Sequence, residues 1–216
     1  MSIRKEIILN TFQELIYKKT GKNLDKIVNL KADASDRKIY RLFYEDNSII
    51  GIFNENKKEN LAFISFTGSF SKVGLNVPQI ISVSDDNLFY IEEDLGDMTL
   101  FNYTSSYLNE DYIGLYKRSL SDLVRFQVTS KDVVDYSFCY QTSEFDRMVI
   151  ESDLNKFDVY SNSLHLKTDF DLAVRESIID HSIDILRKAN NDFFLYRDFQ
   201  PRNMMLKNKS LYYIDY

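Results

Sequence analysis

The chain has 216 residues, a net charge of −6, 44% hydrophobic residues, 6 glycines and 2 prolines. This composition excludes a low-complexity or disordered chain, because the apolar residues suffice for a sizeable core. The acidic charge argues against nucleic acid and anionic membranes as partners, since both attract basic surfaces. No run of about 18 apolar residues suggests a transmembrane helix. A single cysteine, Cys139, cannot form a disulfide within the chain, which favours a cytoplasmic location.

The first 92 residues predict a sheet with two helices. A helix from Ser2 to about Thr20 is indicated by an apolar stripe, and a second helix is expected from Glu55 to about Lys72. The stripe of the first helix consists of Ile8, Phe12, Leu15 and Ile16. Strands are predicted at residues 26–30, 38–44, 48–53, 79–83 and 88–92. The turn at residues 45–47 predicts an antiparallel hairpin of the second and third strands.

The remaining residues predict mostly helices. Helical periods cover residues 109–128, 143–154 and 168–189, and a hairpin pairs residues 204–206 with 211–214. The apolar side chains that fall in phase in the first of these helices are Ile113, Tyr116, Leu120, Leu123 and Val124. The third helix carries a stripe that is expected to be buried, formed by Val174, Ile178 and Ile185. A sheet followed by helices predicts an α+β, bilobal fold. We expect an N-terminal nucleotide-binding lobe at residues 1–95 and a C-terminal helical catalytic lobe at residues 96–216.

The chain Tyr196-Arg197-Asp198 to Asn203, followed by a hairpin and Asp215, is typical of phosphoryl-transfer sites. Asp198 can orient and deprotonate a substrate hydroxyl. Asn203 and Asp215 offer the oxygen ligands that Mg²⁺ prefers. The hairpin returns the chain, so Asp215 is expected beside Asn203. The alternative is a loop whose Asp and Asn only cap turns.

Two arginines have open roles near this motif. Arg202 can neutralise charge on the transferred phosphoryl group or pair with Asp198, and the sequence does not decide between them. Residues 49–53 lack the lysine that protein kinases carry on their third strand. Either an arginine, Arg37 or Arg41, supplies that charge instead, or phosphate binding is weak.

The turn before the second strand is a candidate phosphate-binding loop. It has no glycine-rich motif, but the small side chain of Ser35 and the neighbouring Asp36 and Arg37 allow the backbone to approach phosphate. An ordinary polar turn with solvated arginines is the alternative. After the fifth strand, Glu93, Asp94 and Leu95 are candidates for a hinge whose backbone binds adenine, or else form an acidic linker.

Five segments together carry a resemblance to a known family: residues 32–42, 74–78, 93–97, 196–203 and 213–215. In this order they resemble the kinases of the aminoglycoside phosphotransferase type. Within that group they are most similar to the bacterial branch that includes the anomeric N-acetylmuramate/N-acetylglucosamine kinases. The resemblance implies a protein-kinase-like fold and ATP- and Mg²⁺-dependent phosphorylation of a sugar or amino-sugar hydroxyl.

The resemblance also implies residue roles and departures. It makes Asp198 the catalytic base, Asn203 and Asp215 the metal ligands, residues 93–95 the hinge, and Arg41 with residues 35–37 the phosphate cover. Tyr196 stands where the family often has His. Relatives continue beyond the position of Asp215, so we expect a truncated C-terminal lobe. A nucleotide-binding pseudokinase or inactive fragment, and a protein–protein adaptor, are therefore the alternative functions.

Overall fold

The computed structural model describes residues 3–30, 37–106, 111–163, 171–186, 188 and 192–216. Contacts divide the chain into two compact units. The first unit comprises Met1–Phe138 with Phe194–Tyr216, and the second comprises Cys139–Phe193. The predicted lobe boundary at residue 95 stays a prediction, since this division separates the chain elsewhere.

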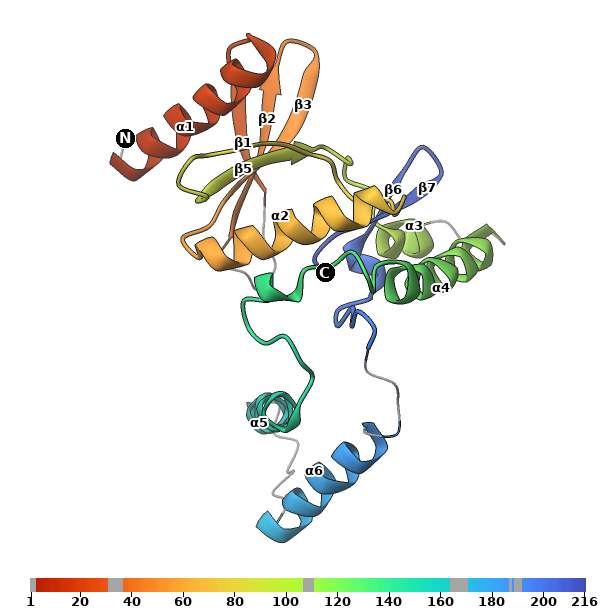
Figure 1. The fold of residues 1–216 in the computed structure, drawn as a ribbon. Helices are drawn as coiled ribbons and strands as arrows, with labels where there is room; N and C mark the ends of the chain where they lie inside the picture. Colours follow the sequence, from red (N-terminus) through yellow and green to blue (C-terminus); the bar gives the residue numbers. More distant parts are fainter. Residues whose placement is uncertain (1–2, 31–36, 107–110, 164–170, 187, 189–191) are drawn as a thin grey trace. The chain divides into compact units, whose positions relative to one another are not determined.

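The first unit contains a five-stranded antiparallel sheet in the order β1-β2-β3-β5-β4. The strands are β1 (Lys26–Leu30), β2 (Lys38–Tyr44), β3 (Asn47–Phe53), β4 (Ile80–Val83) and β5 (Phe89–Glu93). The helix α1 (Ile3–Thr20) precedes β1, and α2 (Lys57–Lys72) connects β3 to β4 (Figure 1). All five strands and both helices were predicted from the sequence, with ends that differ by one or two residues.

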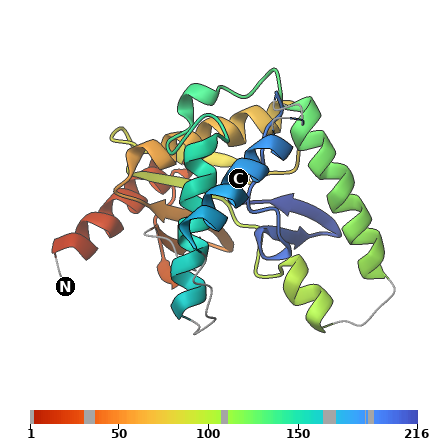
Figure 2. The ribbon, with the colours of Figure 1, turned by 90° about the horizontal axis from the view of Figure 1, so that it is seen from below.

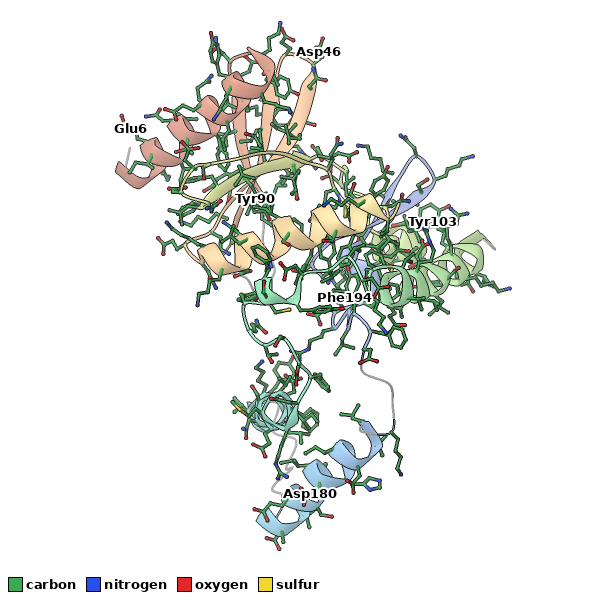
Figure 3. All side chains as sticks on the ribbon, viewed as in Figure 1. Glu6, Asp46, Tyr90, Tyr103, Asp180 and Phe194 are labelled. Carbon is green, nitrogen blue, oxygen red and sulfur yellow. The ribbon has the colours of Figure 1, made fainter. Side chains whose placement is uncertain are left out.

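The two faces of the sheet carry different apolar clusters. On one face, α1 buries its predicted stripe against β2, β3 and β5, with Phe12 and Ile91 fully buried. This packing is so close that a Cβ on Gly51 would lie 2.7 Å from the Phe12 ring. On the other face, Ile52 and Tyr90 pack with Phe63 of α2 (Figure 3). Helix α2 therefore covers this face of β3 and β5.

A second group of elements completes the first unit. It comprises α3 (Leu100–Ser106), α4 (Asp111–Thr129), the 3-10 turns η1 (Tyr136–Phe138) and η2 (Pro201–Asn203), and the hairpin of β6 (Met204–Lys207) and β7 (Ser210–Tyr213). Figure 2 shows the hairpin beside α3 and α4. The Leu206 N–H donates to the Met98 carbonyl at 2.7 Å, and the Tyr213 N–H donates to the Asn76 carbonyl at 2.9 Å. These bonds tie the hairpin to the segment that follows β5 and to the segment that leads from α2 into β4.

The helix predicted at residues 109–128 is present as α4, but much of its apolar stripe is exposed. Ile113, Leu120 and Val124 are 48%, 61% and 56% exposed, whereas Ser119 and Phe126 are buried. Phe126 packs against Phe70 of α2, so the helix turns this side toward the interior. Helical periodicity defined an apolar stripe, but the aromatic neighbours determined which side is covered.

The second unit contains α5 (Arg147–Ser163) and α6 (Leu172–Leu186). They pack through the buried side chains of Ile150 and Ile179, and Arg147 forms an ion pair with Asp180 at 2.8 Å. Helix α5 lies later in the chain than predicted. The stripe predicted for α6 is exposed, with Val174, Ile178 and Ile185 at 47%, 38% and 54%. Residues 168–170, the first three of the predicted helix, lie outside the described residues.

Among the helices of the described residues, none combines the length and apolar character needed to cross a membrane.

Candidate active site

The loop before β6 presents Asp198 at the surface on a rigid base. Phe194 and Tyr196 are buried, while Asp198 is exposed. The Gln200 N–H donates to the Asp198 carbonyl at 2.8 Å, and the Asn203 N–H donates to the Gln200 carbonyl at 2.9 Å. Pro201 begins the η2 turn, where its missing N–H costs no hydrogen bond. Backbone hydrogen bonds within the loop therefore hold its conformation.

The side-chain amide of Asn203 is oriented by this loop. Its Nδ2 donates to the Asp198 carbonyl at 3.1 Å, so its Oδ1 is the amide atom left to act as a ligand. The Ile214 N–H donates to the Asn203 carbonyl at 3.0 Å. The hairpin thus returns the chain beside Asn203, as predicted, and Asp215 follows directly.

The Tyr196 side chain contacts the segment that leads to Asp215. Its hydroxyl donates to the Ile214 carbonyl at 2.6 Å, next to Asp215. Burial is the main cause that raises the pKa of Tyr196, and the negative charges of Asp215 and Asp198 raise it further. Both carboxylates therefore lie near this one ring. The Tyr196 hydroxyl thus links this loop to the residue before Asp215.

Arg37 joins three distant parts of the chain. Its Nε lies 2.5 Å from Glu59 Oε1 on α2, and its Nη2 lies 3.2 Å from Asp215 Oδ1. Glu59 was not among the site residues predicted from the sequence. The only signal was an acidic side chain in the first turn of α2, where it also suits the helix dipole.

Asp215 and Tyr216 are held in a defined backbone conformation. Asp215 has φ of 60°, in the left-handed region that non-glycine residues seldom adopt. The Tyr216 ring stacks on Phe63 at 5.1 Å and meets Phe70 edge-on at 4.8 Å. Its hydroxyl also hydrogen-bonds with Thr67. Three residues of α2 thus fix the residue that follows the candidate metal ligand.

Arg202 has a contact that neither sequence alternative included. Its guanidinium lies over the Phe101 ring of α3, 4.0 Å from the centroid. This cation–π contact places a positive charge at the edge of the loop. The predicted catalytic role of Arg202 stays a prediction.

The candidate hinge follows β5 and is bound to the β6–β7 hairpin. Lys207 Nζ lies 2.7 Å from Glu93 Oε1 and donates to the Asp94 carbonyl at 2.9 Å. Leu95 is buried. Lys207 therefore joins Glu93 and Asp94 to the β6–β7 hairpin.

Arg41 belongs to the hinge in this structure. Its Nε lies 2.7 Å from Asp94 Oδ2, and its Nη1 lies 2.8 Å from Asp97 Oδ1. Burial raises the pKa of Asp94, but hydrogen bonds from the Gly96 N–H, the Ser48 hydroxyl and Arg41 outweigh it and hold that pKa below its usual value. The charge of Arg41 is thus paired here, and its predicted contact with phosphate stays a prediction. Ser35 and Asp36 lie outside the described residues.

Comparison with known proteins was made by family model, sequence and structure. No family model matches the chain. The chain is 25% identical over 197 residues to the N-acetylmuramate/N-acetylglucosamine kinase of Pseudomonas aeruginosa, which covers 88% of this chain and 54% of the relative. It is 24% identical over 181 residues to the enzyme of the same name from Neisseria meningitidis serogroup B, covering 81% and 51%. The chain therefore spans about half the length of these curated relatives.

Solved structures with the same fold are phosphotransferases. The aminoglycoside phosphotransferase APH(2")-IIa matches with a TM-score of 0.59 and 16% identity, covering 100% of this chain and 71% of that one. The spectinomycin phosphotransferase APH(9)-Ia matches with a TM-score of 0.59 and 13% identity, covering 95% and 68%. The resemblance predicted from the motifs is confirmed, and the chain has the α+β, protein-kinase-like fold of the aminoglycoside phosphotransferases.

Proposed function

We propose that this chain belongs to an ATP-dependent kinase that phosphorylates a hydroxyl of a sugar or amino sugar. The observation that carries the proposal is the return of the hairpin to the catalytic loop, where the Ile214 N–H bonds the Asn203 carbonyl at 3.0 Å. This bond places two oxygen-bearing side chains, Asn203 and Asp215, on adjacent backbone segments beside Asp198. Such an arrangement suits in-line phosphoryl transfer, which requires positioning and charge neutralisation above all.

The residues present fit a magnesium ion. The Asn203 amide is turned so that Oδ1 is its ligand atom, and Asp215 adds a half-exposed carboxylate. One or two such oxygens, completed by phosphate and water, are what Mg²⁺ usually takes from a protein. When bound, the ion supplies charge neutralisation at the β- and γ-phosphates. Asp198, exposed at the loop surface, accepts the proton of the substrate hydroxyl in this proposal.

Arg37 takes the part of the missing strand lysine in this proposal. It is held by Glu59 of α2 at 2.5 Å and reaches Asp215 at 3.2 Å, so its guanidinium lies at the metal end of the site. A phosphate bound beside Asp215 would meet this charge, and a guanidinium matches phosphate oxygens bidentately. Ser35 and Asp36, which precede Arg37 in the chain, stay proposed phosphate-loop residues. Arg202 stays a proposed neutraliser of the transferred phosphoryl group.

The relatives support the reaction and suggest the acceptors to test. The two curated relatives are named for kinase activity on N-acetylmuramate and N-acetylglucosamine. APH(2")-IIa was solved with streptomycin and ATP, and APH(9)-Ia with ADP and spectinomycin. We propose ATP as the phosphoryl donor and an amino sugar as the acceptor class. The cytoplasmic location also stays a proposal.

The test combines nucleotide binding with turnover. The thermal midpoint of the chain is measured with Mg-ATP, and ADP release is then measured with N-acetylmuramate, N-acetylglucosamine and an aminoglycoside. Stabilisation by Mg-ATP and ADP release that depends on one acceptor are expected. Absence of any nucleotide response would contradict the proposal and favour the adaptor alternative.

A nucleotide-binding protein without turnover is the second candidate. The ion pair of Arg37 with Asp215 at 3.2 Å favours it, because a metal ion must share or displace this partner of the carboxylate. Stabilisation by Mg-ATP without ADP release from any of the three acceptors would select this candidate.

A further inference from the structure

Three acidic residues follow one another at the end of β5, and one of them lacks a cationic partner. Glu93 is paired with Lys207 at 2.7 Å, and Asp94 is paired with Arg41 at 2.7 Å. Glu92 has no such ion pair among the described residues. Its Oε2 atom is buried and accepts no hydrogen bond from the part of the chain that the structure describes. A buried carboxyl oxygen without a partner is costly, so this group calls for an explanation.

The position of Glu92 points to the nucleotide side of the sheet. Side chains alternate along a strand, so Glu92 shares its face of β5 with Tyr90, which packs on Phe63 of α2. Its partner in β3 is Ile50, which lies against the same cluster. The next residue, Glu93, begins the candidate hinge. Glu92 therefore stands at the hinge end of the face that carries Arg37 and Tyr216 nearby.

The electrostatic surroundings keep this carboxyl neutral. Burial is the main cause that raises the pKa of Glu92 to about 8, the charge of Glu93 raises it further, and Arg37 opposes both. The other ionisable groups that interact with it are the hydroxyls of Tyr90 and Tyr216, whose own pKa values are raised mainly by burial. A neutral carboxyl offers one hydrogen-bond donor and one acceptor, whereas a carboxylate offers acceptors alone.

We propose that Glu92 is a specificity-determining residue that contacts the purine base of the bound nucleotide through its carboxyl group. This inference rests on the proposed nucleotide site and adds a residue to it. In the neutral form, the O–H donates to a ring nitrogen of adenine and the carbonyl oxygen accepts from the exocyclic amino group. Such a pair satisfies the orphaned oxygen and distinguishes a base from the phosphates, which Arg37 and Asp215 serve.

Three proteins and two probes test the inference. Affinity for Mg-ATP and for Mg-tripolyphosphate, which has no base, is measured for the parent, Glu92→Gln and Glu92→Leu. Gln keeps a donor and an acceptor without a titratable proton, and Leu removes both. We expect Glu92→Leu to weaken Mg-ATP about tenfold, the ratio that one or two net hydrogen bonds supply. Glu92→Gln stays within about threefold of the parent, and tripolyphosphate binding is unchanged in all three.

Each other outcome has a definite meaning. Equal losses for Mg-ATP and tripolyphosphate, or no loss for either, would overturn the role of Glu92 while leaving the proposed function intact. A parent that binds neither probe would overturn the proposed function and the inference together. Should Glu92→Leu fail to fold, the parent and Glu92→Gln are compared from pH 6.5 to 9.5. The parent must then lose Mg-ATP affinity above about pH 8 relative to Glu92→Gln, and parallel profiles would refute the inference.

Discussion

The two ends of the candidate site each contain an arginine held by two carboxylates, yet they differ in reach. At the hinge, Arg41 pairs with Asp94 and Asp97, which lie close together in sequence. At the metal end, Arg37 pairs with Glu59 of α2 and with Asp215, which closes a span of 178 residues. Arg41 fixes one loop, whereas Arg37 joins a helix, the sheet and the hairpin. Substitutions of the two arginines are therefore expected to have different effects.

This difference indicates which of the two arginine clusters still has a charged group that a ligand can contact. In the Arg41 cluster the charges are paired with one another, and Asp94 also accepts hydrogen bonds from the Ser48 hydroxyl and the Gly96 N–H. The Arg37 cluster includes Asp215, whose side chain is 50% exposed. A phosphate or metal ion can therefore bind at the Arg37 cluster next to the exposed Asp215 carboxylate, without exposing a charge that is now buried.

The largest effect is expected at the catalytic loop. Asp198→Ala should lower kcat by about 10³-fold, within the range that a general base supplies, with Mg-ATP affinity nearly unchanged. Asp97→Asn, which loosens the Arg41 cluster at the surface, is the matched carboxylate control and should retain activity within about tenfold. ADP release under saturating acceptor measures both. An Asp198→Ala variant as active as the parent removes the base from the mechanism.

The second effect separates the two arginines directly. Arg37→Met should lower kcat/KM by about 10²-fold, because it removes the charge beside Asp215 and leaves Glu59 without its partner. Arg41→Met should cost about tenfold or less and act mainly on the stability of the hinge. Initial rates over a series of ATP concentrations distinguish the two variants. Equal losses would mean that Arg41, too, serves the phosphates.

A third effect concerns stability and pH at Glu92. The folded state holds the Glu92 proton up to about pH 8, whereas the unfolded chain releases it near pH 4.5. Stability from this group is therefore complete below pH 4.5 and is lost as the pH rises through this window. The free energy of unfolding of Glu92→Gln should rise relative to the parent by up to about 1.4 kcal/mol per pH unit in this range. Urea unfolding at pH 5, 6.5 and 8 measures it, and a constant difference contradicts the shifted pKa.

The smallest effect is expected below the loop. Tyr196→Phe keeps the buried ring but removes the 2.6 Å hydrogen bond to the Ile214 carbonyl. The expected loss is about 1 kcal/mol of stability, with a modest fall in kcat because Asp215 is less well positioned. Thermal unfolding and ADP release report the two parts. A variant with unchanged stability and unchanged kcat would show that Tyr196 does not brace the metal end.

The sequence predicted the sheet and the catalytic hairpin because both depend on local signals. Alternating apolar residues and short polar turns define each strand. A single hairpin separates Asp198 and Asn203 from Asp215, so their spacing can be read along the chain. The helix α3 was missed, since seven residues are too few to show a helical period. Hairpin geometry predicted the pairing of β2 with β3, whereas the pairing of β3 with β5 crosses over α2 and β4 and had no local signal.

Contacts between distant segments were not predictable in the same way. Arg37 and Arg41 were equivalent in sequence, and their difference arises from Glu59 and Asp94, which reach them from other elements. Helix α4 does carry an apolar stripe, but the Phe126 ring, which lies outside that stripe, packs against the rings of Phe70 and Tyr213. Such outcomes depend on which surfaces meet, and periodicity along one helix carries no information about that.

The most direct test of the central claim is the structure of the chain with Mg²⁺ and a non-hydrolysable ATP analogue. The account predicts one metal ion held by Asn203 Oδ1 and the Asp215 carboxylate, with Arg37 on the phosphates and Asp198 facing the γ-phosphate. A nucleotide bound elsewhere, or a metal ion that contacts neither Asn203 nor Asp215, would contradict it.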